Sequence, residues 1–173
     1  MRVNGHVGNP AWFRDAFSQH EGRLVRYAQR IVGDVERARD VAQETFLRLA
    51  KQQPSDVDGH LTEWLFTVCR NQALDVRRKE QRMTTLAEAA AITTPSREPE
   101  PATAAETQDA ASHILGLITA LPENQQEVIH LKFQNSLSYR EIAAITGLSV
   151  SNVGFLIHRG LKTIRGRVKR AEA

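Results

Sequence analysis

The residues of this sequence that are best suited to chemistry lie near its C-terminal end, and the chemistry they suit is the binding of nucleic acid. In 138–165, apolar residues at helical spacing lead to Gly147 and then to a second helical pattern. Gly147 enters positive φ without steric cost, and Ser149 or Ser151 can cap the second helix. The second helix carries a dense set of basic residues: His158, Arg159, Lys162, Arg165, Arg167, Lys169 and Arg170.

This arrangement predicts a helix-turn-helix. In such a motif the N-terminal end of the second helix faces base edges, while cations contact phosphates. The inward-facing positions expected by spacing are Tyr139, Ile142, Ala143 and Ile145 in the first helix, and Val153, Ile157, Leu161, Ile164 and Val168 in the second. The alternative interpretation of this segment is a helical hairpin with a solvated basic tail.

Residue patterns for catalysis are absent from the sequence. The 6 histidines form no i,i+4 pair and have no cysteine cluster near them. Neither the phosphate-binding pattern GxxxxGK[ST] nor the nucleophile pattern GxSxG occurs. Cys69 lies in an apolar helical pattern, which favours a small core residue over a nucleophile or redox sensor. We therefore expect no enzymatic activity, no cofactor and no bound metal.

Composition sets further limits. The 173 residues suffice for one ordinary domain or two small ones, and the net charge of +3 permits nucleic-acid binding without requiring it. A single cysteine fits a reducing cytosol. No apolar run approaches the roughly 18 residues of a membrane span, and the N-terminus lacks the apolar stretch of a secretory signal. We expect a cytoplasmic protein that does not insert into membranes.

Helical periodicity predicts three helices, 12–32, 34–52 and 60–83, which together close one small core. Gly33 ends the first helix, Asp34 starts the second, and 52–59 is a loop. The expected inward residues are Phe13, Phe17, Leu24, Ala28, Ile31 and Val32, then Ala38, Val41, Ala42, Thr45, Phe46 and Leu49, then Trp64, Leu65, Val68, Cys69, Gln72, Leu74 and Val76.

The composition changes over 84–110, which is rich in Ala, Thr, Pro and Glu and is typical of a flexible linker. Order is expected again at Ala111, with an apolar helix stopped by Pro122. Pro122 suits the first turn of a next helix, which packs Val128, Ile129, Leu131 and Phe133. We predict an all-α fold with a disordered N-terminus (1–11), a helical domain (12–83), a linker (84–110) and a second helical domain (111–173).

Three pieces of the sequence resemble one family. They are DVAQETFLRLAKQ (40–52), WLFTVCRNQALDVRRKEQR (64–82) and ALPENQQEVIHLKF with SLSYREIAAITGLSVSNV (within 120–153). In this order they resemble the extracytoplasmic-function sigma factors, bacterial initiation subunits with only regions 2 and 4. The resemblance implies a protein that binds core RNA polymerase, directs it to promoters, helps to open the duplex and is held by an anti-sigma factor. The alternative is a stand-alone DNA-binding regulator that uses 12–83 for dimerisation.

The resemblance implies a polymerase-binding surface on the side of 40–52 opposite the Val41–Thr45–Leu49 stripe. Its residues are Asp40, Gln43, Glu44 and Leu47. In the family this surface grips a coiled coil of the largest polymerase subunit. Acidic and amide groups can pair with arginines of a partner helix, while Phe46 or Leu47 adds apolar contact. The alternative is an ordinary solvated helix face.

The resemblance also implies a site for the −10 element, where a base is unstacked and displaced phosphates are held. The candidates are Asp56, Asp58, His60, Arg70, Asn71, Arg77, Arg78 and Arg82. Trp64 either stacks on a base or lies in the core, and its apolar neighbours favour the core. The basic run at 77–79 has the alternative role of a solvated helix end.

For the −35 element the resemblance implies a recognition helix with the candidates Ser149, Ser151, Asn152, Phe155, His158, Arg159 and Lys162. The sequence departs from the family pattern, which has Lys at Gly154, Ser at Phe155, and Arg at Leu156 and Leu161. Three cations that would read guanine or bind phosphate are therefore missing. Phe155 either contacts a thymine methyl or packs on a neighbour, and packing is favoured. We expect −35 recognition to depend more on Ser151, Asn152 and DNA shape.

The acidic residues of the linker have two interpretations. Glu98, Glu100, Glu106 and Asp109 mimic nucleic-acid charge inside the polymerase, as the resemblance implies, or they only solvate a tether.

Overall fold

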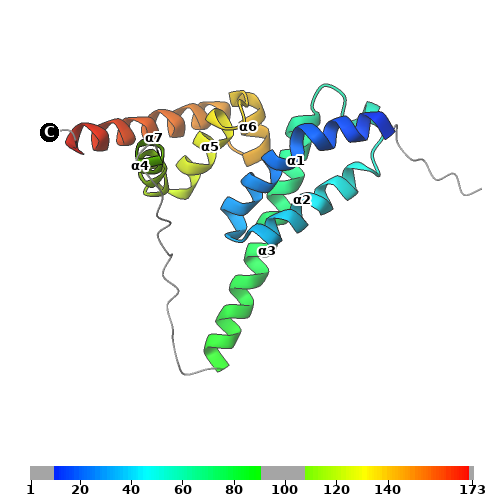
Figure 1. Cartoon of the computed structure of the whole chain (residues 1–173), viewed down its shortest axis with the longest axis horizontal. Helices are drawn as coiled ribbons and strands as arrows, with labels where there is room; N and C mark the ends of the chain where they lie inside the picture. Colours follow the sequence, from blue (N-terminus) through cyan, green and yellow to red (C-terminus); the bar gives the residue numbers. More distant parts are fainter. Residues whose placement is uncertain (1–9, 91–107, 172–173) are drawn as a thin grey trace, which may run out of the picture. The chain divides into compact units, whose positions relative to one another are not determined.

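The computed structural model describes residues 10–90 and 108–171, and every regular element in these ranges is helical (Figure 1). The chain divides into two compact units, Met1–Thr93 (unit 1) and Thr94–Ala173 (unit 2). The elements are α1 (Pro10–Val32), α2 (Val35–Leu49), the 3₁₀ turn η1 (Pro54–Asp56), α3 (Leu61–Ala90), α4 (Gln108–Thr119), α5 (Glu123–Phe133), α6 (Tyr139–Thr146) and α7 (Val150–Ala171).

The predicted all-α fold is confirmed. The predicted disordered N-terminus lies almost wholly outside the described residues, and so do the linker carboxylates Glu98, Glu100 and Glu106. The helices next to the linker are longer than expected, because α3 continues from Met83 to Ala90 and α4 begins at Gln108 rather than at Ala111. The domain and linker bounds stay a prediction.

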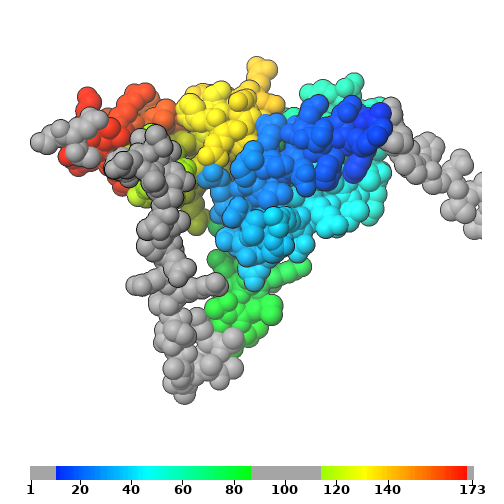
Figure 2. Space-filling view, in the orientation of Figure 1, coloured from blue at the N-terminus to red at the C-terminus, as the bar shows by residue number. Residues whose placement is uncertain are grey.

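In unit 1, a sharp reversal joins α1 to α2. Gly33 takes φ +79°, a left-handed conformation that costs glycine nothing. Asp34 then caps α2, because its carboxylate accepts a hydrogen bond of 2.9 Å from the backbone N–H of Arg37. This turn lets α2 fold back along α1, and the two helices lie side by side in Figure 2.

The buried face of α2 is the one that the sequence predicts. All six expected positions are buried: Ala38, Val41, Ala42, Thr45, Phe46 and Leu49. The Phe46 ring meets α1 through the rings of Phe17 and Phe13, with centroids 4.7 and 6.2 Å away. Phe17 itself keeps 37% of its surface exposed and lies at the edge of the core rather than inside it.

The set of buried residues in α3 differs from the expected set. Leu65, Cys69 and Gln72 are buried as expected, and Phe66 and Ala73 are buried as well. Four positions expected inside are only half-buried: Trp64, Val68, Leu74 and Val76. Trp64 therefore lies at the edge of the core, partly covered and partly exposed. Because α3 packs on both α1 and α2, the arc between those two helices decides which of its apolar residues are covered.

The C-terminal turns of α3 extend past α1 and α2 (Figure 1). Met83 and Leu86 accordingly expose 70% and 71% of their surfaces. The Ala-, Glu- and Leu-rich segment favours helix by intrinsic propensity without tertiary support.

In unit 2, α5 and α7 form the centre of the core. Pro122 immediately precedes α5, and Val128, Ile129 and Leu131 are buried. Phe133 was expected inside, yet 57% of its surface is exposed at the last residue of α5. Gly160 is a core position that the periodicity did not indicate. A Cβ on Gly160 would lie 2.6 Å from Cδ1 of Ile129, so the missing side chain allows α7 to cross α5 closely.

The helix-turn-helix consists of α6, a turn at Gly147 and α7. Gly147 takes φ +74° and caps α6 in the left-handed conformation, as predicted. Ile142, Ala143 and Ile145 are buried. Tyr139, expected on the same inward face, is 39% exposed because it begins the helix at the surface.

Ser138 starts α6 through a capping box. Its hydroxyl accepts the N–H of Glu141 at 3.2 Å, and the Glu141 carboxylate accepts the N–H of Ser138 at 2.7 Å. We expect Ser138→Ala to destabilise α6 by about 1 kcal/mol. Hydrogen exchange of the α6 amides should then be roughly fivefold faster, since 1.4 kcal/mol is a factor of ten. Ser151→Ala, an exposed position inside α7, is the control. Equal exchange in Ser138→Ala and wild type would contradict this role for the capping box.

Candidate polymerase and nucleic-acid interfaces

The outward side of α2 presents an exposed leucine among acidic and amide groups. Asp40, Gln43 and Glu44 are all exposed, and Leu47 exposes 53% of its surface. We call these four residues the α2 face. They lie on the side of α2 opposite its buried residues, and the packing of those residues fixes the rotation of the helix about its axis. An exposed apolar side chain ringed by hydrogen-bond acceptors suits a partner helix that carries arginines and apolar residues.

Ion pairs on α2 leave this face accessible. Glu44 pairs with Arg48 at 3.3 Å, and both side chains are about half exposed, so the pair contributes little and a partner can replace it. At the other end, Arg37 reaches Glu80 of α3 at 2.6 Å. This second contact joins α2 to the C-terminal half of α3. Arg37 is seven residues before Glu44 and so lies at the edge of the α2 face, beyond Asp40.

The loop before α3 is held by local hydrogen bonds. The Asp56 carboxylate accepts the N–H of Gln53 at 3.1 Å, and Nδ1 of His60 lies 3.0 Å from the carbonyl oxygen of Asp58. Val57 is buried (1% exposed) and anchors the loop to the core. The side chains of Asp56, Asp58 and His60 remain exposed, so the structure brings these candidates together in one short, anchored loop.

Along α3, the candidate cations form two neighbouring lines. Arg70 and Arg77 are seven residues apart and so share one line, where both are half-buried. Asn71, Arg78 and Arg82 are exposed and lie about 100° further round the helix. Arg78 pairs with Asp75 at 2.6 Å with both side chains exposed. The four arginines are thus spaced along neighbouring sides of α3, which suits the binding of a nucleic-acid backbone that follows the helix.

Trp64 extends the second of these lines toward the start of α3. At seven-residue spacing it precedes Asn71, and Asn71 precedes Arg78. Trp64 is half-buried, so this residue keeps some exposed surface near the start of the line.

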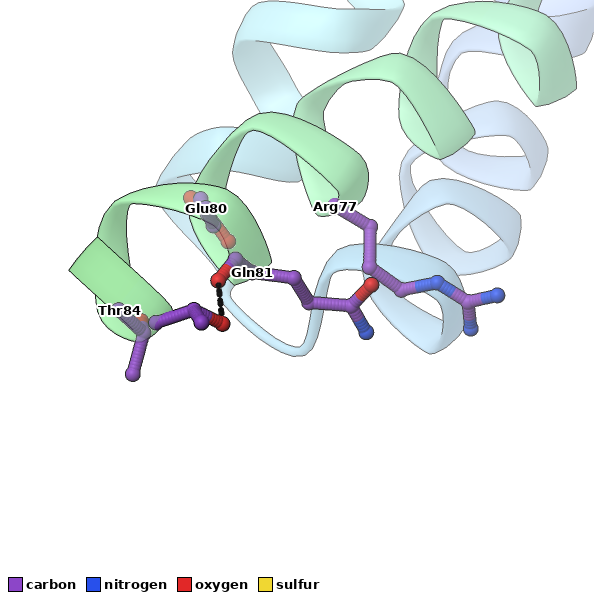
Figure 3. A pocket seen from close by; sticks show the side chains of 5 residues that line it. Arg77, Glu80, Gln81 and Thr84 are labelled. Atoms are coloured by element: carbon purple, nitrogen blue, oxygen red, sulfur yellow. Dashed lines mark hydrogen bonds between the residues drawn. The ribbon is translucent and has the colours of Figure 1, made fainter. Parts of the chain in front are cut away.

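An open hollow lies beside the C-terminal half of α3 (Figure 3). Its lining residues are Arg77, Glu80, Gln81, Thr84 and Thr85. The hydroxyl of Thr85 donates to the carbonyl oxygen of Gln81 at 2.8 Å. The side chains of Arg77 and Gln81 extend the same way from the helix in Figure 3. Sequence reasoning named only Arg77 among these, because Gln and Thr on a polar helix face give no signal of their own.

In unit 2, the structure decides which serine caps α7, the second helix of the helix-turn-helix. The Ser149 hydroxyl accepts the N–H of Asn152 at 3.1 Å, so Ser149 caps α7 and Ser151 is free of that role. The remaining candidates of this helix are all exposed: Ser151, Asn152, Phe155, His158, Arg159 and Lys162. They share one side because Val153, Leu156 and Ile157 are buried on the other.

Two of the three positions that lack the family's cations do not face outward. Leu156 is 7% exposed and Leu161 is half-buried, so both belong to the packed side of α7. At Gly154, a Cβ would lie 3.5 Å from the ring of Tyr139, an ordinary contact distance. Gly154 is half-buried beside this ring, so none of the three positions is fully exposed.

Phe155 packs against a neighbour on one side only and is otherwise exposed. Its side chain exposes 56% of its surface. Its ring lies beneath the guanidinium of Arg159, with Cζ 5.9 Å from the ring centroid. Phe155 is thus presented outward among the polar residues of α7.

Other features bear on metal and membrane binding. Among the residues that the structure describes, no three His, Cys, Asp or Glu side chains gather as metal ligands would. In the same ranges, no single helix is both long and apolar enough to cross a membrane, while α6 and α7 taken together, bent by 103°, pass by length and composition only.

Comparison with protein families gives two matches, one in each unit. Residues 16–83 match Sigma-70 region 2, and residues 113–164 match Sigma-70, region 4. The match over 16–83 favours the sigma-factor interpretation over the stand-alone regulator, which needs no region 2.

Several curated proteins are similar over nearly the whole chain. The chain is 31% identical over 170 residues to the ECF RNA polymerase sigma factor SigL of Mycobacterium tuberculosis, covering 95% of this chain and 93% of the relative. It is 27% identical over 171 residues to SigW of Bacillus subtilis, with 94% and 91% covered. A solved structure, the sigma factor RpoE in complex with the anti-sigma factor NepR from Bartonella quintana, has the same fold, with a TM-score of 0.67, 22% identity, and 91% and 96% of the two chains covered.

Proposed function

The chain belongs to the extracytoplasmic-function sigma factors, which direct RNA polymerase to promoters, and we propose how its residues divide this work. Unit 1 binds core RNA polymerase and opens the −10 element, and unit 2 reads the −35 element. The observation that carries the proposal is the coincidence of the two family matches with two exposed side-chain sets, the α2 face and the outward side of α7.

The α2 face is the proposed polymerase-binding surface. Leu47 supplies the apolar centre, since an exposed leucine surrounded by polar groups is a typical anchor of a helix–helix interface. Asp40, Gln43 and Glu44 supply acceptors for cations of the polymerase helix.

The loop before α3 and the two lines on α3 are the proposed −10 site. Asp56, Asp58 and His60 present hydrogen-bonding groups to an unstacked base, while Val57 keeps the loop in place. Arg70, Asn71, Arg77, Arg78 and Arg82 follow the displaced strand along α3.

The outward side of α7 is the proposed −35 site. Ser149, Ser151 and Asn152 lie in the first turns, where a recognition helix meets base edges. Phe155 and His158 follow, and Arg159 and Lys162 are placed to contact phosphates.

Three further properties follow from the proposed role. RNA synthesis belongs to the polymerase, so we expect no catalytic activity and no cofactor in this chain. Its site of action is the cytoplasm, where the polymerase is. An anti-sigma factor, such as the one bound to the solved neighbour, would regulate it by covering the α2 face or the helix-turn-helix.

The test is transcription with purified core polymerase on the DNA upstream of the protein's own operon. We expect a heparin-resistant transcript with the wild-type chain. The double variant Asp40→Arg/Glu44→Arg should reduce this transcript at least about tenfold, because like charges then face each other across the interface. Binding to core polymerase, measured by gel filtration, should fall in parallel.

The matched control is Asp15→Arg/Glu21→Arg. It makes the same change of net charge at two exposed positions of α1 and should leave the transcript unchanged. If DNA binds the isolated chain while no polymerase complex and no transcript form, the proposed function is wrong. If both double variants behave alike, the assignment of the α2 face is wrong.

A further inference from the structure

The start of α7 has no group for the commonest base contact. From Glu141 to His158 the chain contains no lysine or arginine, and the first such residue of α7 is Arg159. Bidentate pairing of Arg or Lys with guanine is the contact that recognition helices use most often. The outward residues of the first turns are instead Ser151, Asn152, Phe155 and His158.

Phe155 occupies the centre of this outward side. Ser151 lies one turn before it and Arg159 one turn after it, while the adjacent Leu156 is only 7% exposed. A ring with 56% of its surface exposed therefore points the way the polar residues do. The guanidinium of Arg159 over the ring limits the ring's freedom on that side.

Phe155 differs in kind from its neighbours on this side. The residues three and four positions away on the helix surface are all polar or charged: Ser151, Asn152, His158 and Arg159. Further exposed apolar surface lies toward Gly154, where Val150 exposes 46% of its surface and the Tyr139 ring is 3.5 Å from the Cβ position of Gly154. An exposed phenylalanine on a helix that enters the major groove offers an apolar contact to a base edge.

In the major groove, the apolar group that distinguishes one base from the others is the C5-methyl of thymine. We propose that Phe155 contacts this methyl and selects a T·A pair at one position of the −35 element. The proposal rests on the proposed function, in which α7 enters the major groove, and adds the identity of a base. Cytosine has only hydrogen at C5 and would lose the contact.

The test uses holoenzyme and duplexes with a randomised −35 region. Selection for binding should enrich thymine at one position or more. Each enriched thymine is then replaced by deoxyuridine, which removes the methyl and keeps the pairing. At the Phe155 position, wild-type binding should weaken about fourfold, the value of one buried methyl group. Replacing C·G by 5-methylcytosine·G at that position should strengthen binding by a similar factor.

Two variants of Phe155 separate the contact from the fold. Phe155→Ser should be indifferent to deoxyuridine at every position, whereas Phe155→Leu should keep part of the response. Because the side chain is exposed, both variants should unfold at the wild-type denaturant concentration. Deoxyuridine in the spacer between the two elements is the DNA control and should change nothing.

The outcomes distinguish the two proposals. An enriched −35 sequence whose binding does not depend on any thymine methyl, or depends on it equally in Phe155→Ser, would overturn the role of Phe155 and leave the proposed function standing. A selection with no enriched −35 sequence at all, despite transcription, would overturn both this inference and the proposed reading role of α7.

Discussion

Phe66→Ala should lower the free energy of unfolding of unit 1 by about 3–5 kcal/mol, the usual cost of emptying a buried phenylalanine site. The Phe66 side chain is 0% exposed. Its ring lies 5.3 Å from that of Tyr27 and beneath the guanidinium of Arg23, with Cζ 5.5 Å from the centroid. The site joins α3 to α1, so alanine would leave a cavity between the two helices that rigid backbones cannot close.

Tryptophan fluorescence measures this change in the full chain, because both tryptophans, Trp12 and Trp64, lie in unit 1. Unfolding in urea should then report unit 1 selectively. Phe66→Leu, which nearly conserves volume, should cost less than about 1.5 kcal/mol. The control is Phe17→Ala, which deletes the same atoms at a site with 37% exposure and should cost clearly less. Equal losses in Phe66→Ala and Phe17→Ala would show that the Phe66 site can collapse.

That Phe66 was not among the expected core residues shows where periodicity fails. In α2 a single narrow stripe is apolar and both ends carry turn signals, so all six buried positions could be predicted. In α3 the sequence WLF places apolar residues over a broad arc. The positions of α1 and α2 decide that Phe66 is buried in the core and that Trp64 is only half-buried. The residues around Phe66 in the sequence do not reveal this packing, because the helices it contacts are distant in the chain.

The end of α3 illustrates a second limit. Pro- and Glu-rich composition after residue 84 predicted a linker, yet helix continues to Ala90. A helix can continue for a few turns without packing on another element, because alanine, leucine and glutamate favour the helical conformation by themselves. Composition therefore located the change in burial, at Met83, better than the end of the helix.

The exposure of the candidate site residues was easier to predict than the burial of the core residues, for a physical reason. Asp40, Glu44 and Arg78 carry charge, so an amphipathic helix must direct them to solvent, and all three are exposed. Phe155 is the exception, because an aromatic residue next to Leu156 and Ile157 fits a core as well as a surface. Helical phase assigns Leu156 and Ile157 to the core and leaves Phe155 outside, but only once the positions of α5 and α6 are known.

Cys69 should be nearly inert toward thiol reagents in the folded chain. Its side chain is 0% exposed, and burial raises the pKa of the thiol to about 12, against a weaker lowering effect of a hydrogen bond with Thr45. The thiolate is the reactive form, so the raised pKa and the lack of access to the buried sulfur both slow the reaction. At pH 8 we expect alkylation to be at least about a thousandfold slower in the folded chain than in the urea-unfolded chain. A domain with a free energy of unfolding of about 5 kcal/mol opens in fewer than about one molecule in a thousand, and only the open molecules react.

The pH dependence follows from the same raised pKa. Below the pKa of the unfolded chain the thiol is protonated in both states and contributes nothing. As the pH rises from there toward about 12, only the unfolded state loses the proton, so the free energy of unfolding of unit 1 should fall. Urea unfolding at pH 8 and pH 10 measures this, and Cys69→Ala provides the comparison because it removes the titrating group. An equal pH response in the two proteins would contradict the assignment.

Alkylation of Cys69 also provides an independent measure of the Phe66 effect, because both side chains are buried on α3 in unit 1. If the reagent reaches Cys69 only when unit 1 opens, the alkylation rate follows the fraction of open molecules. Phe66→Ala should then raise the rate by a factor between about one hundred and several thousand, which corresponds to 3–5 kcal/mol. Phe133→Ala, an exposed site in unit 2, should leave the rate unchanged. A native rate within tenfold of the unfolded rate would mean that Cys69 is accessible by a local motion, and the rise on Phe66→Ala would then be absent.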